Sequence, residues 1–307
     1  MVRHERRSRF ARGFAILLIT VAVALIPGIG DVAATGESGS EAALRWVDVG
    51  QGAAMIAVDG DVAVVIDSGP SAAAEPLLAA LDAHGVRRVD LWIHTHFDAD
   101  HLGGVLRAVD GADAIAGTGD DLEITSLWDR GLEAPPSTGV MERYLARFAD
   151  RRSAPALGDR WARGRISVEV VGIGAGPQEN ARGLALRVEV SAITAAVLGD
   201  LPAAEGVVAA ARAGPVDVLW ASHHGARGGF DPALLEPLDP GLVVISAGHD
   251  NRYCHPAPEV LAWLADRPVW ITGAAGVAAH GRCPALAPAL GPEHEVRGED
   301  LVLRAGE

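Results

Sequence analysis

Four side chains that could bind a metal ion lie within one short segment, His96-Phe97-Asp98-Ala99-Asp100-His101. The segment offers two imidazoles and two carboxylates, which are nitrogen and oxygen ligands that zinc, manganese and iron accept. Alternate residues at a strand end can converge on one point, and Gly103-Gly104 allows close approach of the backbone as a helix begins. A solvated acidic loop with incidental histidines is the alternative, and the further candidate ligands downstream disfavour it. The segment therefore predicts a metal-binding loop.

The candidate ligands follow directly after short apolar runs that predict strands. These runs span residues 89–93, 195–198 and 216–220, and they lead into His96, Asp200 and the pair His223-His224. His94 would point away from His96 if its strand continues, so we expect His94 in the core. The polar groups are thus predicted to lie at the C-terminal ends of strands.

The remaining pattern predicts an α/β fold. Glycine-rich turns separate the first apolar runs, which is typical of a β-meander. Further strands are predicted at residues 44–49, 54–58, 62–66, 166–171, 184–190, 242–246 and 269–272, and helices at residues 73–84, 102–109, 141–149 and 258–265. Residues 110–136 are rich in Gly, Asp and Pro, and we predict a loop region there. We expect two sheets sandwiched between helices.

The composition is that of an acidic globular protein. The 307 residues are 49% hydrophobic and include 37 glycines, which suits a well-packed protein with many tight turns and argues against disorder. Compact α/β folds of this length can form one unit, so we predict a single folded domain. The formal net charge is -14. Because an acidic surface repels phosphate backbones, we expect no stable binding of duplex DNA.

The N-terminus predicts export to the periplasm or the extracellular space. Five arginines precede the apolar stretch from Phe14 to Pro27, and Val32-Ala33-Ala34 then supplies small residues that a signal peptidase accepts. The apolar stretch is shorter than the roughly 20 residues that a membrane-spanning helix needs. We therefore predict a signal peptide, with an uncleaved membrane anchor as the alternative. The predicted divisions are residues 1–34 for this segment, 35–43 for a linker and 44–307 for the folded domain.

Cys254 and Cys283 are the two cysteines of the chain. An oxidising compartment permits a disulfide between them, and two free buried thiols are the alternative. The sequence leaves both readings open.

The segment from Thr95 to Gly104 resembles the metal motif of metallo-β-lactamase-fold hydrolases. It is similar especially to the soluble domain of ComEC-type DNA-uptake competence proteins, in which an aspartate replaces the second histidine, as Asp98 does here. Further matches are Val47-Asp48-Val49-Gly50-Gln51-Gly52, Ile66-Asp67-Ser68-Gly69, Leu198-Gly199-Asp200, His223-His224-Gly225 and Asn251-Arg252-Tyr253-Cys254-His255-Pro256. The resemblance spans roughly residues 44–275 and implies a four-layer αββα metallo-β-lactamase sandwich.

The resemblance also implies a metal site with one or two divalent ions, zinc or manganese. The implied ligands are His96, Asp98, Asp100, His101, Asp200 and His223. Asp200 would bridge two metals, and His223 would complete the second site. We favour His223 as the ligand because it lies nearer the strand end, with His224 as an orienting or proton-donating neighbour. The reverse order of these two histidines stays open.

Other residues are expected to support the site or the substrate. Asp67 is predicted to hold the metal loop by hydrogen bonds rather than to touch the metal. Asn251 and His255 could bind the departing phosphate or supply a proton, although an Asn turn and a His-Pro loop would look identical in sequence.

One departure from the family pattern concerns the first metal. No histidine occurs between His101 and His223, so the ligand that many two-metal members place there is absent. Asn180, an acid such as Asp120 or Asp121, or water could complete the first site. The alternative is an enzyme that works with a single metal.

These residues predict a metal-dependent hydrolase. A metal that lowers the pKa of a bound water would give a hydroxide that attacks phosphorus, and Asp100, His224 and His255 are the candidate catalytic residues. We expect phosphodiesterase or nuclease-like activity, with single-stranded nucleic acid among the candidate substrates. Hydrolysis of a small-molecule lactone, amide or thioester is the second choice. A non-catalytic exported binding module of the same fold is the rival from another class.

Overall fold

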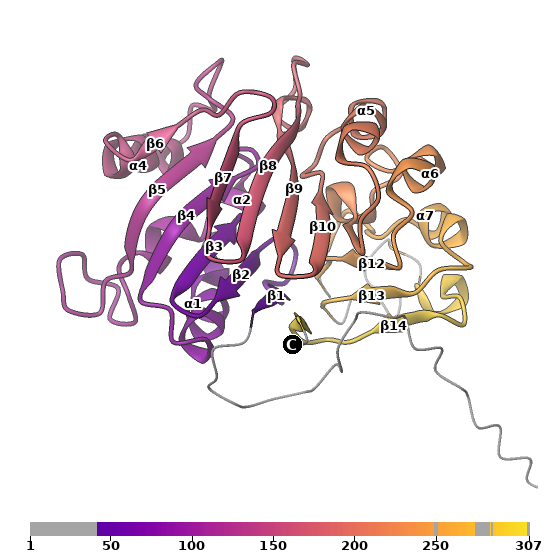
Figure 1. Ribbon diagram of the computed structural model, residues 1–307, viewed down its shortest axis with the longest axis horizontal. Helices are drawn as coiled ribbons and strands as arrows, with labels where there is room; N and C mark the ends of the chain where they lie inside the picture. Colours follow the sequence, from indigo (N-terminus) through magenta and orange to yellow (C-terminus); the bar gives the residue numbers. More distant parts are fainter. Residues whose placement is uncertain (1–41, 249–250, 274–282, 284, 306–307) are drawn as a thin grey trace, which may run out of the picture.

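Two sheets packed face to face, with helices on both outer sides, make up the computed structural model of the protein (Figure 1). The structure describes residues 42–248, 251–273, 283 and 285–305. The expected arrangement of two sheets between helices is therefore confirmed.

The first sheet has seven strands in the order β15-β1-β2-β3-β4-β5-β6. They are β1 (Ala43–Trp46), β2 (Met55–Asp59), β3 (Val62–Ile66), β4 (Arg88–His94), β5 (Glu123–Asp129), β6 (Arg152–Ser153) and β15 (Leu301–Arg304). β1, β2 and β3 pair antiparallel, whereas β3, β4, β5 and β6 are parallel. The residues that follow the parallel strands therefore meet at one edge of the sheet.

The second sheet has eight strands in the order β14-β13-β12-β11-β10-β9-β8-β7. They are β7 (Arg160–Arg163), β8 (Ile166–Ile173), β9 (Leu184–Val190), β10 (Ile193–Val197), β11 (Val218–Trp220), β12 (Leu242–Ile245), β13 (Val269–Ile271) and β14 (His294–Val296). β10 to β14 are parallel, so Asp200 after β10 and His223 after β11 lie beyond the same edge.

Helices cover the outer face of each sheet (Figure 1). On the first sheet lie α1 (Ala74–Ala83), α2 (Ala99–Leu102), α3 (Val105–Ala108) and α4 (Gly139–Phe148), and on the second lie α5 (Ala203–Ala213), α6 (Leu235–Leu238) and α7 (Pro258–Trp263). Short 3-10 turns complete the described elements: η1 (Ser71–Ala73), η2 (Asn180–Arg182), η3 (Ser222–Gly225), η4 (Pro232–Leu234) and η5 (Ala287–Ala289).

Both faces of the central strands β2, β3 and β12 are buried, which explains their nearly continuous apolar sequences. In β3, Val64 and Ile66 point between the two sheets, while Ala63 and Val65 face the helices of the first layer. Burial of each aliphatic side chain of this size contributes roughly 1.5–3 kcal/mol. The sheets thus form a rigid frame for the loops at their carboxyl edge.

One prediction about elements was wrong, and another was confirmed only in part. The predicted loop over residues 110–136 contains β5, a seven-residue strand that pairs with β4 and buries Ile124 and Leu127. The predicted helix over residues 102–109 is two short helices, α2 and α3, separated at Gly103-Gly104. Pairing with β4 outweighed local composition in β5.

The predicted signal peptide falls outside the residues that the structure describes, as does most of the predicted linker. β1 begins at Ala43, one residue before the predicted domain start. Among the described residues, no helix is both long and apolar enough to span a bilayer.

Candidate metal centre

The metal loop, residues His96–His101, follows β4 and includes the first residues of α2, and backbone contacts hold it in place. The N–H of Ala53 donates to the carbonyl of Asp100 at 3.0 Å. A Cβ on Gly52 would lie 2.6 Å from that same carbonyl oxygen, and a Cβ on Gly104 would lie 2.2 Å from the carbonyl oxygen of Ser68. Side chains at these two glycines would push the loop away, so the sequence keeps glycine there.

Asp67 directly follows β3 and holds the metal loop by hydrogen bonds. Its Oδ1 accepts the N–H of Thr95 at 2.8 Å, and its Oδ2 lies 2.8 Å from Thr95 Oγ1 and 2.7 Å from His101 Nδ1. Asp67 is buried. Asp67 Oδ2 accepts a hydrogen bond from His101 Nδ1, so Nε2 of His101 is the nitrogen directed at the other donors and able to act as a ligand. This arrangement matches the predicted role of Asp67.

Asp200 lies among four imidazoles. Its Oδ1 is 3.3 Å from His101 Nε2, and its Oδ2 is 3.5 Å from His223 Nε2, 3.8 Å from His224 Nε2 and 3.9 Å from His96 Nε2. Burial opposes ionisation of Asp200, but the adjacent His101 and His224 outweigh it and hold the pKa of this carboxyl well below its usual range. Imidazole nitrogens from loops of both sheets therefore surround the buried carboxylate of Asp200.

Two sets of donors could each hold an ion. One set is His96, His101 and Asp200, and the other is Asp100, His101 and His224; within each set the ligand atoms lie within 4.8 Å of one another. Nε2 of His96 is buried and has no hydrogen-bond partner among the described residues. A buried polar atom is expected to have a partner, and a cation held by the first set would supply one for this nitrogen. These residues fit one or two divalent ions.

The favoured prediction placed His223 beside Asp100 and His101, but the structure places His224 there. His224 Nδ1 lies 2.9 Å from the carbonyl oxygen of Ser246, and its Nε2 lies 3.3 Å from Asp100 Oδ2 and 3.3 Å from His101 Nε2. His223 lies on a more open side, with 32% of its side chain exposed, and approaches Asp200. His224 is thus positioned as the third donor beside Asp100 and His101.

The backbone explains how two adjacent histidines reach one centre. His223 and His224 both have left-handed conformations, with φ of 53° and 56°. The N–H of His223 donates to the carbonyl of Gly199 at 3.0 Å, which fixes the pair beside Asp200. Non-glycine residues rarely adopt such φ values, and strained backbone of this kind clusters at functional sites.

No histidine lies between His101 and His223 in the sequence, and the residues that could replace such a ligand lie in different places. Asn180 reaches the centre, since its Nδ2 lies 3.2 Å from His223 Nε2. Asp120 and Asp121 instead bond to Thr118 and to backbone N–H groups within their own loop. Asp98 Oδ2 lies 3.6 Å from His96 Nε2, and 42% of the Asp98 side chain is exposed. Asp98 therefore borders the first set and Asn180 contacts His223, whereas Asp120 and Asp121 bond within their own loop.

The loop from Asn251 to Pro256 borders the centre on the second sheet's side. The ring centroid of His255 lies 5.7 Å from that of His223 and 6.3 Å from that of His224. Asn251 bonds within the loop: its Nδ2 donates to the carbonyl of His255 at 2.7 Å and its Oδ1 accepts the N–H of His255 at 2.7 Å. His255 thus faces the site, and Asn251 shapes the loop that carries it.

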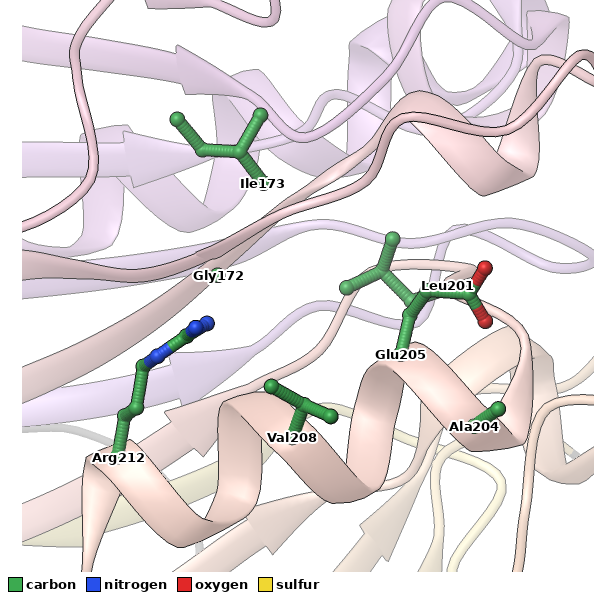
Figure 2. Close-up of a pocket in the computed structure, with 7 residues that line it drawn as sticks. All are labelled: Gly172, Ile173, Leu201, Ala204, Glu205, Val208 and Arg212. Carbon is green, nitrogen blue, oxygen red and sulfur yellow. The ribbon is translucent and has the colours of Figure 1, made fainter.

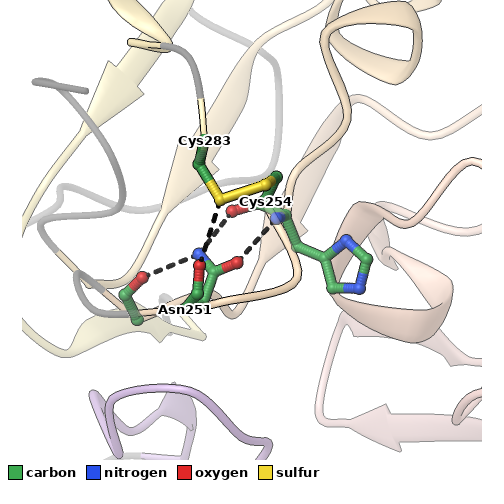
Figure 3. The surroundings of a disulfide bond; sticks show 5 residues. Asn251, Cys254 and Cys283 are labelled. Carbon is green, nitrogen blue, oxygen red and sulfur yellow. Dashed lines mark hydrogen bonds between the residues drawn. A yellow bond between two sulfur atoms is a disulfide. The ribbon is translucent and has the colours of Figure 1, made fainter. Parts of the chain in front are cut away.

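A disulfide joins Cys254 to Cys283 beside this loop (Figure 3). Sγ of Cys283 lies 3.5 Å from the carbonyl oxygen of Asn251. Of the two alternatives for the cysteines, the structure therefore has the disulfide. This bond links the residue before His255 to Cys283, 29 residues further along the chain.

A separate groove of about 310 Å³ lies along α5 (Figure 2). Glu205, Val208 and Arg212 reach it from α5, and Ile173 reaches it from the end of β8. Leu201, which directly follows Asp200, lines the groove as well. Because its described lining holds one acid and otherwise mostly apolar groups, it has no ligand set like that of the centre.

Sequence reasoning missed Thr95, Ser246 and Glu179, the last of which accepts the N–H of Phe97 in the metal loop. Thr95 Oγ1 lies 3.1 Å from His96 Nδ1, and the Ser246 carbonyl orients His224. Thr95 could have been found because it directly precedes His96. A backbone carbonyl such as that of Ser246 leaves no signal in residue type.

Comparison with known proteins places this centre in a family. Residues 47–249 match the model of the Metallo-beta-lactamase superfamily. The chain is 28% identical over 257 residues to ComE operon protein 3 of Bacillus subtilis (strain 168), covering 73% of this chain and 31% of that protein. It is 25% identical over 231 residues to Competence protein ComA of Neisseria gonorrhoeae, covering 72% and 29%. The chain thus spans about a third of the length of these curated relatives.

A solved structure shows the same fold. CmlA, a diiron beta-hydroxylase from Streptomyces venezuelae, is 14% identical with a TM-score of 0.52, covering 88% of this chain and 55% of that chain. Fold and site together define a metal-dependent hydrolase built on the αββα sandwich. The chain belongs to the metallo-beta-lactamase superfamily. The predicted fold and enzyme class are confirmed, and so is the resemblance to ComEC-type proteins.

Proposed function

We propose that this protein is an exported metal-dependent phosphodiesterase or nuclease-like hydrolase. The observation that carries the proposal is the convergence of two donor sets that share His101, one with Asp200 and one with Asp100. Zinc or manganese bound there would supply Lewis-acid activation of water and of a phosphoryl oxygen. The remaining chemistry depends on groups of the chain itself.

The chain orients its imidazoles before any ligand arrives. Asp67 accepts a hydrogen bond from His101 Nδ1, and the carbonyl of Ser246 accepts one from His224 Nδ1. Both histidines therefore present Nε2 to the centre, as ligating histidines do when their other nitrogen is engaged. Ligands fixed in this way are preorganised for the reaction.

His255 is the group best placed to contact a leaving group. It lies next to His223 and His224 at the border of the centre, and it is only partly buried. A hydrogen bond from its ring N–H to the departing oxygen would assist cleavage. Asn251 contributes by holding the His255 backbone at both its N–H and its carbonyl.

Similarity to two competence proteins supports a phosphodiester substrate. Those matches cover 73% and 72% of this chain, but only about a third of each relative. The net charge of -14 disfavours duplex DNA, so single-stranded nucleic acid or a small phosphodiester is the proposed substrate class.

Export is part of the proposal. It rests on the arginine-rich start followed by an apolar stretch, and the disulfide supports it because such bonds persist in oxidising compartments. Fractionation of cells that express the full chain, with N-terminal sequencing of the product, tests it. A mature N-terminus near residue 35 in the periplasmic or extracellular fraction is expected, and an intact chain in the cytosol would contradict export.

The substrate class is tested by one panel of assays. Purified protein is given bis-p-nitrophenyl phosphate, single-stranded DNA, a lactone and a thioester, each with added zinc or manganese. Hydrolysis of the phosphodiesters that is lost in Asp100→Ala supports the proposal. Preferential turnover of the lactone or thioester would replace the substrate, and metal binding without any turnover would indicate a binding module.

A further inference from the structure

We infer that the buried ion pair of Arg130 and Glu179 positions the metal loop for ion binding. The inference rests on the proposed function, because it concerns the same centre. Neither residue belongs to the donor sets, so both would act through the loop.

Glu179 holds the backbone at Phe97, the residue between two candidate ligands. Its Oε1 accepts the N–H of Phe97 at 2.8 Å, and Phe97 lies between His96 and Asp98. This N–H belongs to the peptide that joins His96 to Phe97, so the hydrogen bond fixes the backbone directly after His96 and directs the chain toward Asp98. Glu179 comes from the loop between β8 and β9, so the second sheet sets the conformation of a loop that belongs to the first.

Arg130 locks Glu179 in place and packs on the same residue. Its Nε lies 2.6 Å from Glu179 Oε1 and its Nη2 lies 2.5 Å from Oε2, a bidentate geometry that restricts the carboxylate. The guanidinium carbon lies 4.4 Å from the centroid of the Phe97 ring. The Arg130 side chain is 1% exposed. Phe97 is therefore held at its N–H by Glu179 and at its ring by Arg130.

The same segment also contacts the other side of the centre. Asn180 follows Glu179 directly, and its Nδ2 lies 3.2 Å from His223 Nε2. A shift of Glu179 would therefore disturb the metal loop and the His223 side together. An ion pair that only linked the two sheets would contact neither the metal loop nor His223, whereas Glu179 and the adjacent Asn180 contact both.

Stability and positioning can be separated by mutation. Replacing both members of a buried ion pair with apolar residues of similar volume is often neutral for stability, because no buried charge loses its partner. Arg130→Met with Glu179→Leu thus keeps the packing and removes the acceptor of the Phe97 N–H. Arg130→Met with Glu179→Gln keeps an oxygen at that position. The two double variants differ chiefly in this one hydrogen bond.

The test measures the dissociation constants of zinc and manganese by competition with a chromophoric chelator. The Leu double variant is expected to bind metal at least tenfold more weakly than the unmutated protein, the range found when groups that support metal ligands are removed. The Gln double variant is expected to recover most of that loss. Amide hydrogen exchange at Phe97 supplies a readout without metal: protection is lost with Leu and retained with Gln.

A control uses the Asp59 and Arg165 pair near the β2–β3 turn. Asp59 likewise accepts a backbone N–H, that of Arg165 at 2.7 Å, together with the Arg165 guanidinium. Asp59→Leu with Arg165→Met should leave metal affinity unchanged. Equal affinity in the Leu double variant and the unmutated protein, or no recovery with Gln, overturns the inference. If the unmutated protein binds no metal, the proposed function itself fails.

Discussion

Replacement of Asp67 by Asn should lower the affinity for metal, because it changes which ring nitrogen of His101 carries the proton. The substitution keeps the shape, and the remaining oxygen can still accept the N–H of Thr95. At the Oδ2 position, which lies 2.7 Å from His101 Nδ1, an amide NH₂ would stand instead of a carboxylate oxygen. His101 Nδ1 must then accept rather than donate, so the ring proton moves to Nε2. A protonated Nε2 cannot bind a cation.

The size of the effect follows from this geometry. His101 belongs to both donor sets, so both ions would be weakened. We expect a 10- to 100-fold rise in the dissociation constant of zinc, which corresponds to about 1.4–2.7 kcal/mol. Exchange of a hydrogen bond to a carboxyl group for one to an amide should also lower the free energy of unfolding of the metal-free protein, by about 0.5–2 kcal/mol.

Chelator competition measures the zinc affinity, and urea unfolding of the metal-free protein measures stability. Asp90→Asn is the control, because Asp90 is equally buried near the start of β4 and accepts the N–H of Ala63 at 3.0 Å. Asp90→Asn should leave zinc affinity unchanged. An Asp67→Asn variant that binds zinc within twofold of the unmutated protein would refute the role assigned to the His101 proton.

Three further predictions concern the centre and its supports. His224→Ala should weaken zinc binding at least tenfold more than His223→Ala, because Nε2 of His224 lies in the Asp100 set; chelator competition would show an equal or reversed effect if this order is wrong. Gly104→Ala should destabilise the protein by roughly 1–3 kcal/mol in urea unfolding, since its Cβ would lie 2.2 Å from a backbone oxygen. Cys254→Ser with Cys283→Ser should cost about 3–4 kcal/mol for a 29-residue separation, and an unchanged melting curve would contradict this.

The metal loop could be predicted because its candidate ligands are contiguous. Four polar side chains directly after an apolar strand leave a signal in a single segment, and Asp67 was recognisable from the same family pattern. Which of His223 and His224 lies beside Asp100 could not be predicted in this way. Both residues have the same chemistry, and only their consecutive left-handed backbone conformations decide which nitrogen reaches Asp100.

Long-range contacts explain what the sequence did not reveal. Glu179 reaches Phe97 across 82 residues and Arg130 across 49, and no local pattern marks any of the three as partners. β5 was missed for a related reason. Its sequence, EITSLWD, lies within a stretch rich in Gly, Asp and Pro, and pairing with β4 and burial of alternate side chains make it a strand.

Metal content of the purified protein tests the central claim most directly. The protein is equilibrated with zinc or manganese, freed of unbound ions and analysed by mass spectrometry for metal per chain, with His101→Ala as the comparison. The account predicts one or two equivalents bound to the unmutated protein and a marked loss in the variant, because His101 is shared by both donor sets. A folded, metal-free protein, or unchanged metal content without His101, would contradict it.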